Sequence, residues 1–192
     1  ETPLHGAQAR LLHTGRSVGA APSIGSWLSY GLGTENAQLP GYVLLNNDWI
    51  PNGGIENFAS SFLPATHQAT MVRAKGTPVD NIVPADAIDL QRLKLDFLRE
   101  QDGAVARNHG GSEAIESAIQ NYETAARMQT LVPRLCDVNG ETAATLKLYG
   151  VDRKNDYERF YALQCLRARR LVEAGVRFVE VTCPNTHGNN SP

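Results

Sequence analysis

Cysteine is scarce in this chain of 192 residues, and its three cysteines, Cys136, Cys165 and Cys183, lie far apart. An odd number at wide spacing suits neither a disulfide framework nor a zinc site with four cysteine ligands. Cys183 and His187 would supply two zinc ligands, but two ligands do not make a site. We therefore expect a strand-end cysteine and an exposed loop histidine there.

An excess of charge of one sign is also missing. Lysine and arginine number 18, aspartate and glutamate number 20, and the net charge is −2. Because a basic patch is the electrostatic signature of nucleic-acid binding, we expect neither a nucleic-acid partner nor an anionic membrane surface. No stretch approaches the roughly 20 apolar residues of a membrane-spanning helix, so we expect no membrane span.

The N-terminus lacks a secretory signal pattern, and the first residue is Glu1 rather than methionine. We therefore expect either a processed chain or, with more weight, a segment of a longer protein. The length and the 42% hydrophobic content suffice for one domain with a single core.

Two helices are predicted near the start of the chain. Good helix formers from Leu4 to Leu12 precede Thr14-Gly15, which predicts a short helix that ends in a turn. Pro22-Ser23 then marks the start of a second helix, in which Ile24, Trp27 and Leu28 have helical spacing.

A strand and a long loop follow. Tyr42 to Leu45 is an uninterrupted apolar run, which predicts a buried strand that ends in a polar loop. The stretch from Trp49 to Pro84 is rich in Gly, Pro and Asn, which predicts a surface loop region with one weak strand candidate, residues 69–73.

The second half of the chain is predicted to be helical. Asp86 is the expected cap of a helix that ends at Gly103, with an apolar stripe of Leu90, Leu93 and Phe97. A second helix starts at Ser112 and carries four apolar or aromatic residues on one face, Ile115, Ile119, Tyr122 and Ala126.

Two more helices and a strand complete the expected order. Thr142 starts a short helix that ends at Gly150. Asn155 caps the longest helix, which stops at Gly175 and whose predicted stripe is Tyr157, Tyr161, Cys165, Ala168 and Val172. We expect Cys165 to be a buried, unreactive thiol.

The strand after this helix sets the fold class. Residues 176–181 alternate in a way that is apolar on both sides, and a helix that feeds such a strand through a glycine is half of a parallel-sheet unit. The sequence therefore predicts an α/β fold, rich in helices, with a few parallel strands. Arg167, Arg169 and Arg170 are expected on a solvated helix face.

Candidate binding residues lie where the strands end, because ligands of open α/β sheets bind beyond the carboxyl ends of strands. Asn46, Asn47 and Asp48 follow the first strand and offer oxygen atoms that hard cations or sugar hydroxyls favour. Asn and Asp are also ordinary turn residues, so a plain turn is the alternative.

The first residues of the chain are candidates for catalysis. A nucleophile at a helix start gains from the exposed backbone N–H groups, which stabilise its anionic form or a bound phosphate or sulfate. Thr2 and His5 stand at such a place.

Two long blocks carry a resemblance to a known family. "LLHTGRSVGAAPSIGSWLSYGLGTENAQLPGYVLL" and "LYGVDRKNDYERFYALQCLRARRLVEAGVRFVEVTC" resemble the bacterial family Domain of Unknown Function 1501, within the alkaline-phosphatase-like and sulfatase-like superfamily. The resemblance covers essentially the whole chain. It implies an alkaline-phosphatase-like fold, of which this chain holds part, and a metal-dependent hydrolase of phosphate or sulfate esters.

The resemblance also implies roles for single residues. Superfamily members hold divalent metals with Asp and His at strand ends, which suggests His187 as a metal ligand. Thr14-Gly15-Arg16 matches the end of the sulfatase motif C-x-P-x-R followed by L-T-G-R, which makes Arg16 a substrate-binding candidate. The nucleophile position falls near Leu4 or His5, where no cysteine stands, so the alignment excludes a formylglycine-type sulfatase; Thr2 needs a register shift.

The expected organisation is one incomplete domain, residues 1–192. It comprises a helix–strand region near the active-site corner (1–48), the long loop (49–84), helices and a final strand (85–183) and a truncated loop (184–192). By resemblance the protein is exported to the periplasm or the cell surface and takes a small-molecule or polysaccharide ester. This fragment is expected to be inactive alone. The alternative is a non-catalytic binding or scaffold protein that holds a polysaccharide or a partner protein on residues 49–84.

Overall fold

The computed structural model describes residues 4–46, 50–73, 76–108 and 110–183. Its helices and strands follow one another as α1 (His5–Thr14), α2 (Ile24–Leu32), β1 (Tyr42–Asn46), η1 (Ile55–Phe58), η2 (Ala65–His67), β2 (Thr70–Arg73), α3 (Ile88–Asn108), α4 (Glu113–Cys136), α5 (Ala143–Tyr149), α6 (Asp156–Glu173) and β3 (Phe178–Val181). This confirms the expected α/β class and the predicted order of elements.

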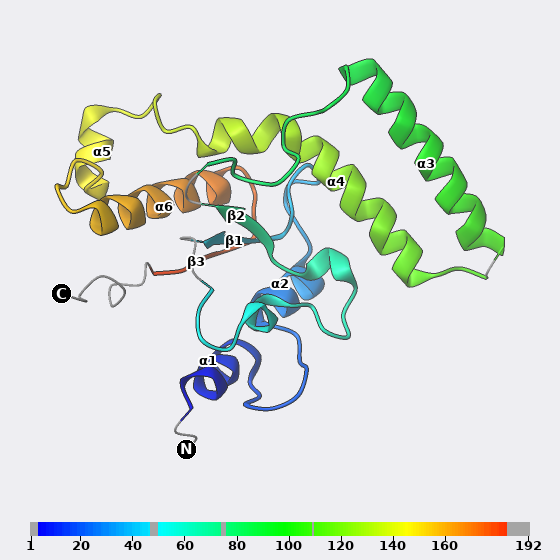
Figure 1. Ribbon diagram of the computed structural model, residues 1–192, viewed down its shortest axis with the longest axis horizontal. Helices are drawn as coiled ribbons and strands as arrows, with labels where there is room; N and C mark the ends of the chain where they lie inside the picture. Colours follow the sequence, from blue (N-terminus) through cyan, green and yellow to red (C-terminus); the bar gives the residue numbers. More distant parts are fainter. Residues whose placement is uncertain (1–3, 47–49, 74–75, 109, 184–192) are drawn as a thin grey trace.

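The strands form one parallel sheet in the order β2-β1-β3, and helices cover both of its faces (Figure 1). Leu45 of β1 pairs with Val72 of β2 and with Val181 of β3. Because the strands are parallel, their carboxyl ends lie at the same edge. Each crossover between them contains helices, as parallel strands require.

The main core lies between one face of the sheet and helices α4 and α6. Val43, Leu45 and Val72 point to this face and pack with Val132 of α4 and Leu171 of α6. All five side chains are at most 2% exposed. Branched apolar residues on β1 thus bury one side of the sheet, as the uninterrupted apolar run predicts.

The other face is covered by α1 and α2 and is more polar. Here α2 turns its small residues, Gly25, Ser26 and Ser29, toward the sheet and leaves Trp27 about half exposed. The ring of Tyr42 requires this arrangement, because a Cβ atom at Gly25 would lie 2.5 Å from it. The helical spacing of the apolar residues in α2 therefore marks its outer side.

Several helix ends confirm the sequence signals. Ser23, Thr142 and Asn155 accept hydrogen bonds from backbone N–H groups of the first turns of α2, α5 and α6. Gly15 and Gly150 end α1 and α5 in the left-handed conformation. The prediction that α6 is the longest helix is wrong: it has 18 residues, α3 has 21 and α4 has 24.

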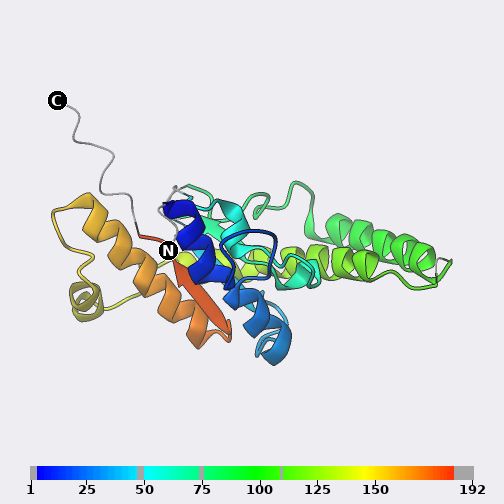
Figure 2. The same ribbon diagram turned by 90° about the horizontal axis from the view of Figure 1, so that it is seen from below.

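Helix α3 differs from its prediction in two ways. It passes through Gly103 and ends at Asn108, because a single glycine weakens a helix without stopping it. The stripe of Leu90, Leu93 and Phe97 is exposed, since α3 packs beside α4 in a hairpin that projects away from the sheet (Figure 2). Asp86 precedes the helix and forms an ion pair with Lys94.

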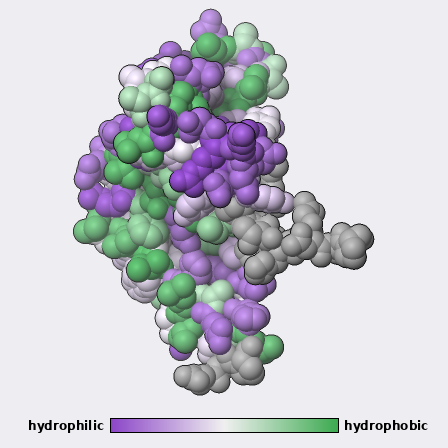
Figure 3. Space-filling model, turned by 90° about the vertical axis from the view of Figure 1, so that its left-hand side faces the viewer, coloured by the Kyte–Doolittle hydropathy of each residue, from purple (hydrophilic) through white to green (hydrophobic). Residues whose placement is uncertain are grey.

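The predicted stripe of α6 is also not its buried face. Leu166 and Leu171 are at most 1% exposed, whereas Tyr157 and Tyr161 are more than a third exposed and Val172 is 55% exposed. The helix is therefore rotated relative to the stripe that counting apolar residues suggests. Charged residues gather at the start of α6, where positions 152–159 are all exposed, and this side of the molecule is largely hydrophilic (Figure 3).

The expectation of a solvated arginine face on α6 is wrong. Arg170 donates to the carbonyl oxygens of Arg134 and Leu135, each at 3.0 Å, and Arg167 donates to that of Cys136 at 3.1 Å. These carbonyls end α4, where a helix leaves its last C=O groups without partners. The guanidinium groups thus cap α4 and join it to α6.

The region 49–84 is not a plain surface loop. It contains η1, η2 and the predicted weak strand, which forms as β2. Phe58, Leu63 and Ile82 of this region are buried. The region therefore supplies core residues and one edge of the sheet, although its glycines and prolines are typical of loops.

Candidate functional site

The first candidate site is the edge of the sheet where the strands end. Asn46 closes β1 there, and it pairs with Arg73 of β2 in the sheet register. Its side chain is buried and accepts a hydrogen bond from Thr182 Oγ1 at 3.1 Å, while its Nδ2 lies 3.6 Å from Met71 Sδ. The predicted binding residue Asn46 is thus held in a fixed orientation beneath the edge.

The first turn of α1 lies against the segment that follows β1. Leu4, the N-cap residue of this helix, makes no side-chain capping hydrogen bond with the described residues. A Cβ atom at Gly6 would lie 3.3 Å from the backbone nitrogen of Gly53, and one at Gly53 would lie 3.0 Å from the carbonyl oxygen of Gly6. Only glycines allow the helix start and this segment to approach so closely.

Asn57 lies beside the same glycine. The residue is fully buried, and its Nδ2 donates to the carbonyl oxygen of Asn52 at 3.0 Å. Its Oδ1 has no hydrogen-bond partner among the described residues. A buried acceptor without a partner costs free energy, so this oxygen is an unsatisfied group beside the start of α1.

The structure separates two of the predicted site residues. His5 is the first residue of α1, and Arg16 follows its last turn, so the length of the helix, about 15 Å, lies between them. Both residues are exposed. Thr14, between them, donates to the carbonyl oxygen of Arg10 and accepts from the backbone of Arg16, which shapes the turn. The other predicted site residues, Thr2, Asn47, Asp48 and His187, lie outside the described residues.

A polar cluster on the α1 side of the sheet escaped the sequence reasoning. Glu180 of β3 lies 3.1 Å from His13 Nδ1 and accepts a hydrogen bond from the Tyr42 hydroxyl at 2.7 Å. Burial, and then the charge of Glu180, raise the pKa of Tyr42 strongly, so the phenol stays protonated. The available signal was a glutamate inside an otherwise apolar strand.

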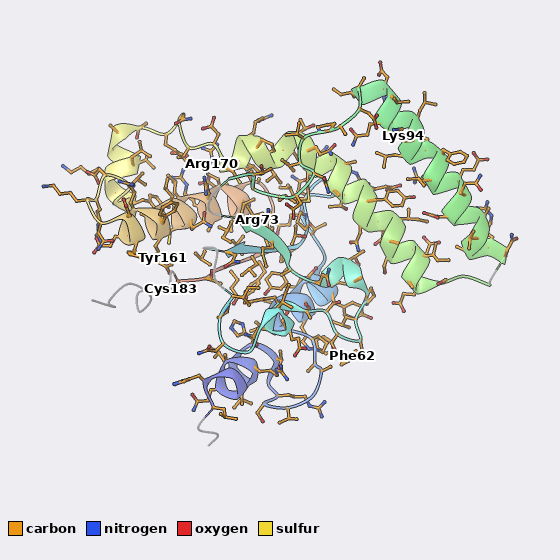
Figure 4. All side chains as sticks on the ribbon, in the orientation of Figure 1. Phe62, Arg73, Lys94, Tyr161, Arg170 and Cys183 are labelled. Carbon is orange, nitrogen blue, oxygen red and sulfur yellow. The ribbon has the colours of Figure 1, made fainter. Side chains whose placement is uncertain are left out.

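Two cysteines lie near one another, Cys165 on α6 and Cys183 after β3. Cys183 follows this strand, and Tyr161 of α6 lies nearby (Figure 4). Burial raises the pKa of the Cys165 thiol, and Tyr161 is hydrogen-bonded to it. Cys165 is half-buried rather than buried, and its raised pKa agrees with an unreactive thiol.

A second candidate site is a groove of about 940 Å³ between η2 and α4. His67 lies at the end of η2. Its Nδ1 forms a hydrogen bond of 3.0 Å with Ser29 Oγ. Burial lowers the pKa of His67, which keeps the ring neutral. The sequence showed no partner for this histidine, because Ser29 stands 38 positions earlier.

Aromatic rings lie in contact with one another beside this groove. We call Trp27, Tyr30, Phe62 and His67 the ring cluster. Trp27 meets Tyr30 at 6.3 Å and Phe62 at 5.8 Å, and Tyr30 meets His67 at 5.3 Å between ring centroids. Phe62 is 70% exposed, and Trp27 and Tyr30 are about half exposed, so the rings face solvent.

The family resemblance implies a metal ion, which would need several donor side chains close together. Among the described residues, no three His, Cys, Asp or Glu side chains lie close enough together to hold one. Asn57 Oδ1 is an oxygen donor without a partner, but one donor is not a site. The described residues therefore do not fit a metal ion by themselves. No helix among them is long and apolar enough to cross a membrane.

A parallel sheet with helices on both faces and polar residues where its strands end defines an α/β protein with its candidate sites at the sheet margin. The family comparison is consistent with this class. Residues 1–191 match the model of the family described as "Protein of unknown function (DUF1501)", and the chain belongs to that family. Comparisons with curated proteins and with solved structures returned no significant match.

Proposed function

We propose that the protein is a metal-dependent hydrolase of phosphate or sulfate esters with an alkaline-phosphatase-like fold. The observation that carries the proposal is the uncapped start of α1, packed through Gly6 against Gly53 and beside the unpartnered Oδ1 of Asn57. Backbone N–H groups at such a helix start attract an anionic ester.

The residues of this corner have distinct proposed roles. The N–H groups of the first turn of α1 stabilise negative charge that develops on an ester oxygen. His5, exposed at the first helical position, transfers a proton or acts as the nucleophile, with Thr2 as the alternative nucleophile. Asn46, Asn47 and Asp48 are the proposed substrate contacts at this corner, and Arg16, at the other end of α1, is a proposed substrate contact away from it.

A divalent metal ion belongs to this proposal, with His187 as a ligand. When bound, such an ion polarises the ester and stabilises the anionic transition state. Because the described residues do not complete a metal site, we assign the ion no step. We further propose export to the periplasm or the cell surface and a small-molecule or polysaccharide ester as the substrate.

The test is ester hydrolysis by the full-length protein. We expect turnover of p-nitrophenyl phosphate or p-nitrophenyl sulfate that requires Zn²⁺, Mg²⁺ or Mn²⁺. His5→Ala should lower kcat/KM by about a hundredfold, because it removes a proton-transfer group or nucleophile. Leu12→Ala changes an exposed residue of the same helix and should retain the activity. A folded full-length wild-type protein that hydrolyses neither ester with any of the three metals would contradict the proposal.

A second candidate function is a non-catalytic binding protein. The ring cluster favours it, because Phe62 of the region 49–84 and two residues of α2 expose aromatic surface beside a groove. Exposed apolar surface next to a groove is typical of ligand or partner sites.

A further inference from the structure

The groove is lined by an unusual share of amide side chains. Its walls include Gln68, Gln91, Gln120, Asn121 and Gln129. Gln91 Nε2 donates to Gln129 Oε1 at 2.7 Å, and Gln129 Nε2 donates to the carbonyl oxygen of Asn81 at 2.8 Å. Each amide carries both donors and acceptors, so the groove offers hydrogen bonds of both kinds.

Charge in the groove is neutralised within its own walls. The charged side chains among its described lining residues are Arg73, Asp80, Glu123 and Arg127. Arg73 forms two hydrogen bonds of 2.7 Å with Asp80. Arg127 forms an ion pair with Glu123, with 2.9 Å between the guanidinium nitrogen and the carboxylate oxygen. The Arg73 guanidinium lowers the pKa of Asp80, which keeps this pair ionised. A charged ligand would have to break one of these pairs.

Two members of the ring cluster line hollows at this place: His67 lines the groove, and Phe62 lines a smaller hollow beside it. A second hollow of about 330 Å³ shares Ala65 and Asn121 with the groove, and Phe62 and Glu113 line it. Phe62 stands on the outer loop between η1 and η2 (Figure 4). Phe62 and the amide side chains therefore line two adjoining hollows, which we call the depression.

We propose that this depression binds a neutral oligosaccharide. Sugar rings present C–H faces that pack on aromatic side chains and hydroxyl groups that both donate to and accept from amides. The paired charges of the larger groove match an uncharged ligand, while Glu113 is the charged residue among the described lining of the second hollow. The two adjoining hollows match a chain of several sugar units. The proposal deepens the second candidate function and does not rest on ester hydrolysis.

A peptide strand fits this place less well. Such a peptide would add to the outer edge of β2, which lies in the groove wall. Two backbone donors of that edge are already bonded within the chain, from Ala69 to Phe58 and from Arg73 to Pro78. The edge is thus protected against strand addition.

Isothermal titration calorimetry of the full chain with neutral hexasaccharides of β-1,4-linked glucose, mannose and xylose tests the proposal. We expect at least one to bind, with a Kd that does not change between low and high salt. Phe62→Ala and Asn121→Ala should each weaken binding about tenfold, through loss of ring packing or of amide hydrogen bonds. Phe97→Ala is the matched control, since it removes an equally exposed ring from α3.

Other outcomes would overturn the proposal. These are no binding of any hexasaccharide by the folded chain, an equal loss in Phe97→Ala, and binding only of sulfated sugars with a steep salt dependence. Hydrolysis of p-nitrophenyl esters is measured on the same preparations. The Phe62→Ala variant should retain any such activity, so failure of binding and failure of hydrolysis are told apart.

Discussion

Single arginine residues hold the C-terminal end of α4 in place. Arg170, about a quarter exposed, binds two carbonyl oxygens of α4 and also Glu141 Oε1 at 2.6 Å. Arg169 binds the same carboxylate at 2.7 Å. These hydrogen bonds lower the pKa of Glu141, so it is ionised near neutral pH. The planar guanidinium group supplies several donors at once, which a lysine does not.

We expect Arg170→Ala to lower the free energy of unfolding by about 2 to 4 kcal/mol, because it leaves two helix-end carbonyls without a donor and removes one of the two arginines that bind Glu141. Urea unfolding followed by circular dichroism measures the change. Arg159→Ala is the control: Arg159 forms an exposed pair with Asp156, which is worth about 0.5 kcal/mol or less. Equal losses in both variants would refute the capping role.

At the scale of single elements, helix starts follow local chemistry. Asn155 accepts from the N–H groups of Tyr157 and Glu158, at 2.9 and 3.4 Å. Ser112 stands at the same position before α4, yet its side chain makes no capping hydrogen bond. Asn and Ser are both common N-cap residues, but here only Asn155 caps its helix with its side chain.

This difference gives a matched pair of variants. Asn155→Ala should destabilise the protein by about 1 kcal/mol, because it removes the acceptor of two N–H groups of α6. Ser112→Ala should cost less than about 0.5 kcal/mol, since no hydrogen bond is lost. Thermal unfolding of the two variants beside the wild type measures both effects. A larger loss in Ser112→Ala would contradict the described cap geometry.

At the scale of the whole molecule, the sheet separates an apolar side from a polar one. Helices α4 and α6 close the main core. On the other face, α1 and α2 lie over Tyr42 and Glu180, and His13 of α1 contacts Glu180. The hairpin of α3 and α4 extends beyond both layers. The orientation of α6 on the sheet thus decides which of its residues stabilise the fold.

Two neighbouring residues of α6 test this orientation. Leu171 is 1% exposed in the core, whereas Val172, part of the stripe that the sequence suggests, is 55% exposed. We expect Leu171→Ala to cost about 2 to 5 kcal/mol through the cavity it leaves, and Val172→Ala less than about 1 kcal/mol. Denaturant titration compares the two, and the reverse ranking would show that α6 packs through the other stripe.

Local signals in the sequence determined the order and the class of the elements. Each of these signals acts over a few residues of its own element. They are the caps Ser23, Thr142 and Asn155, the stop at Gly15 and the apolar run of β1. Such signals predict where helices and strands form. They also led correctly to a parallel α/β sheet, while the resemblance of two long blocks of sequence led to the family to which the chain belongs.

Only the tertiary structure decided which helix faces are buried and which distant residues meet. Tyr42 and Glu180 are 138 positions apart, and Ser29 and His67 are 38 apart. The first contact depends on the pairing of β1 with β3, and the second depends on how α2 and the region 49–84 pack together. Arginine is a residue type that is mostly found on the surface, yet Arg170 caps another helix. The physical reason is that capping and turn formation are local, whereas burial depends on the packing of the complete set of elements.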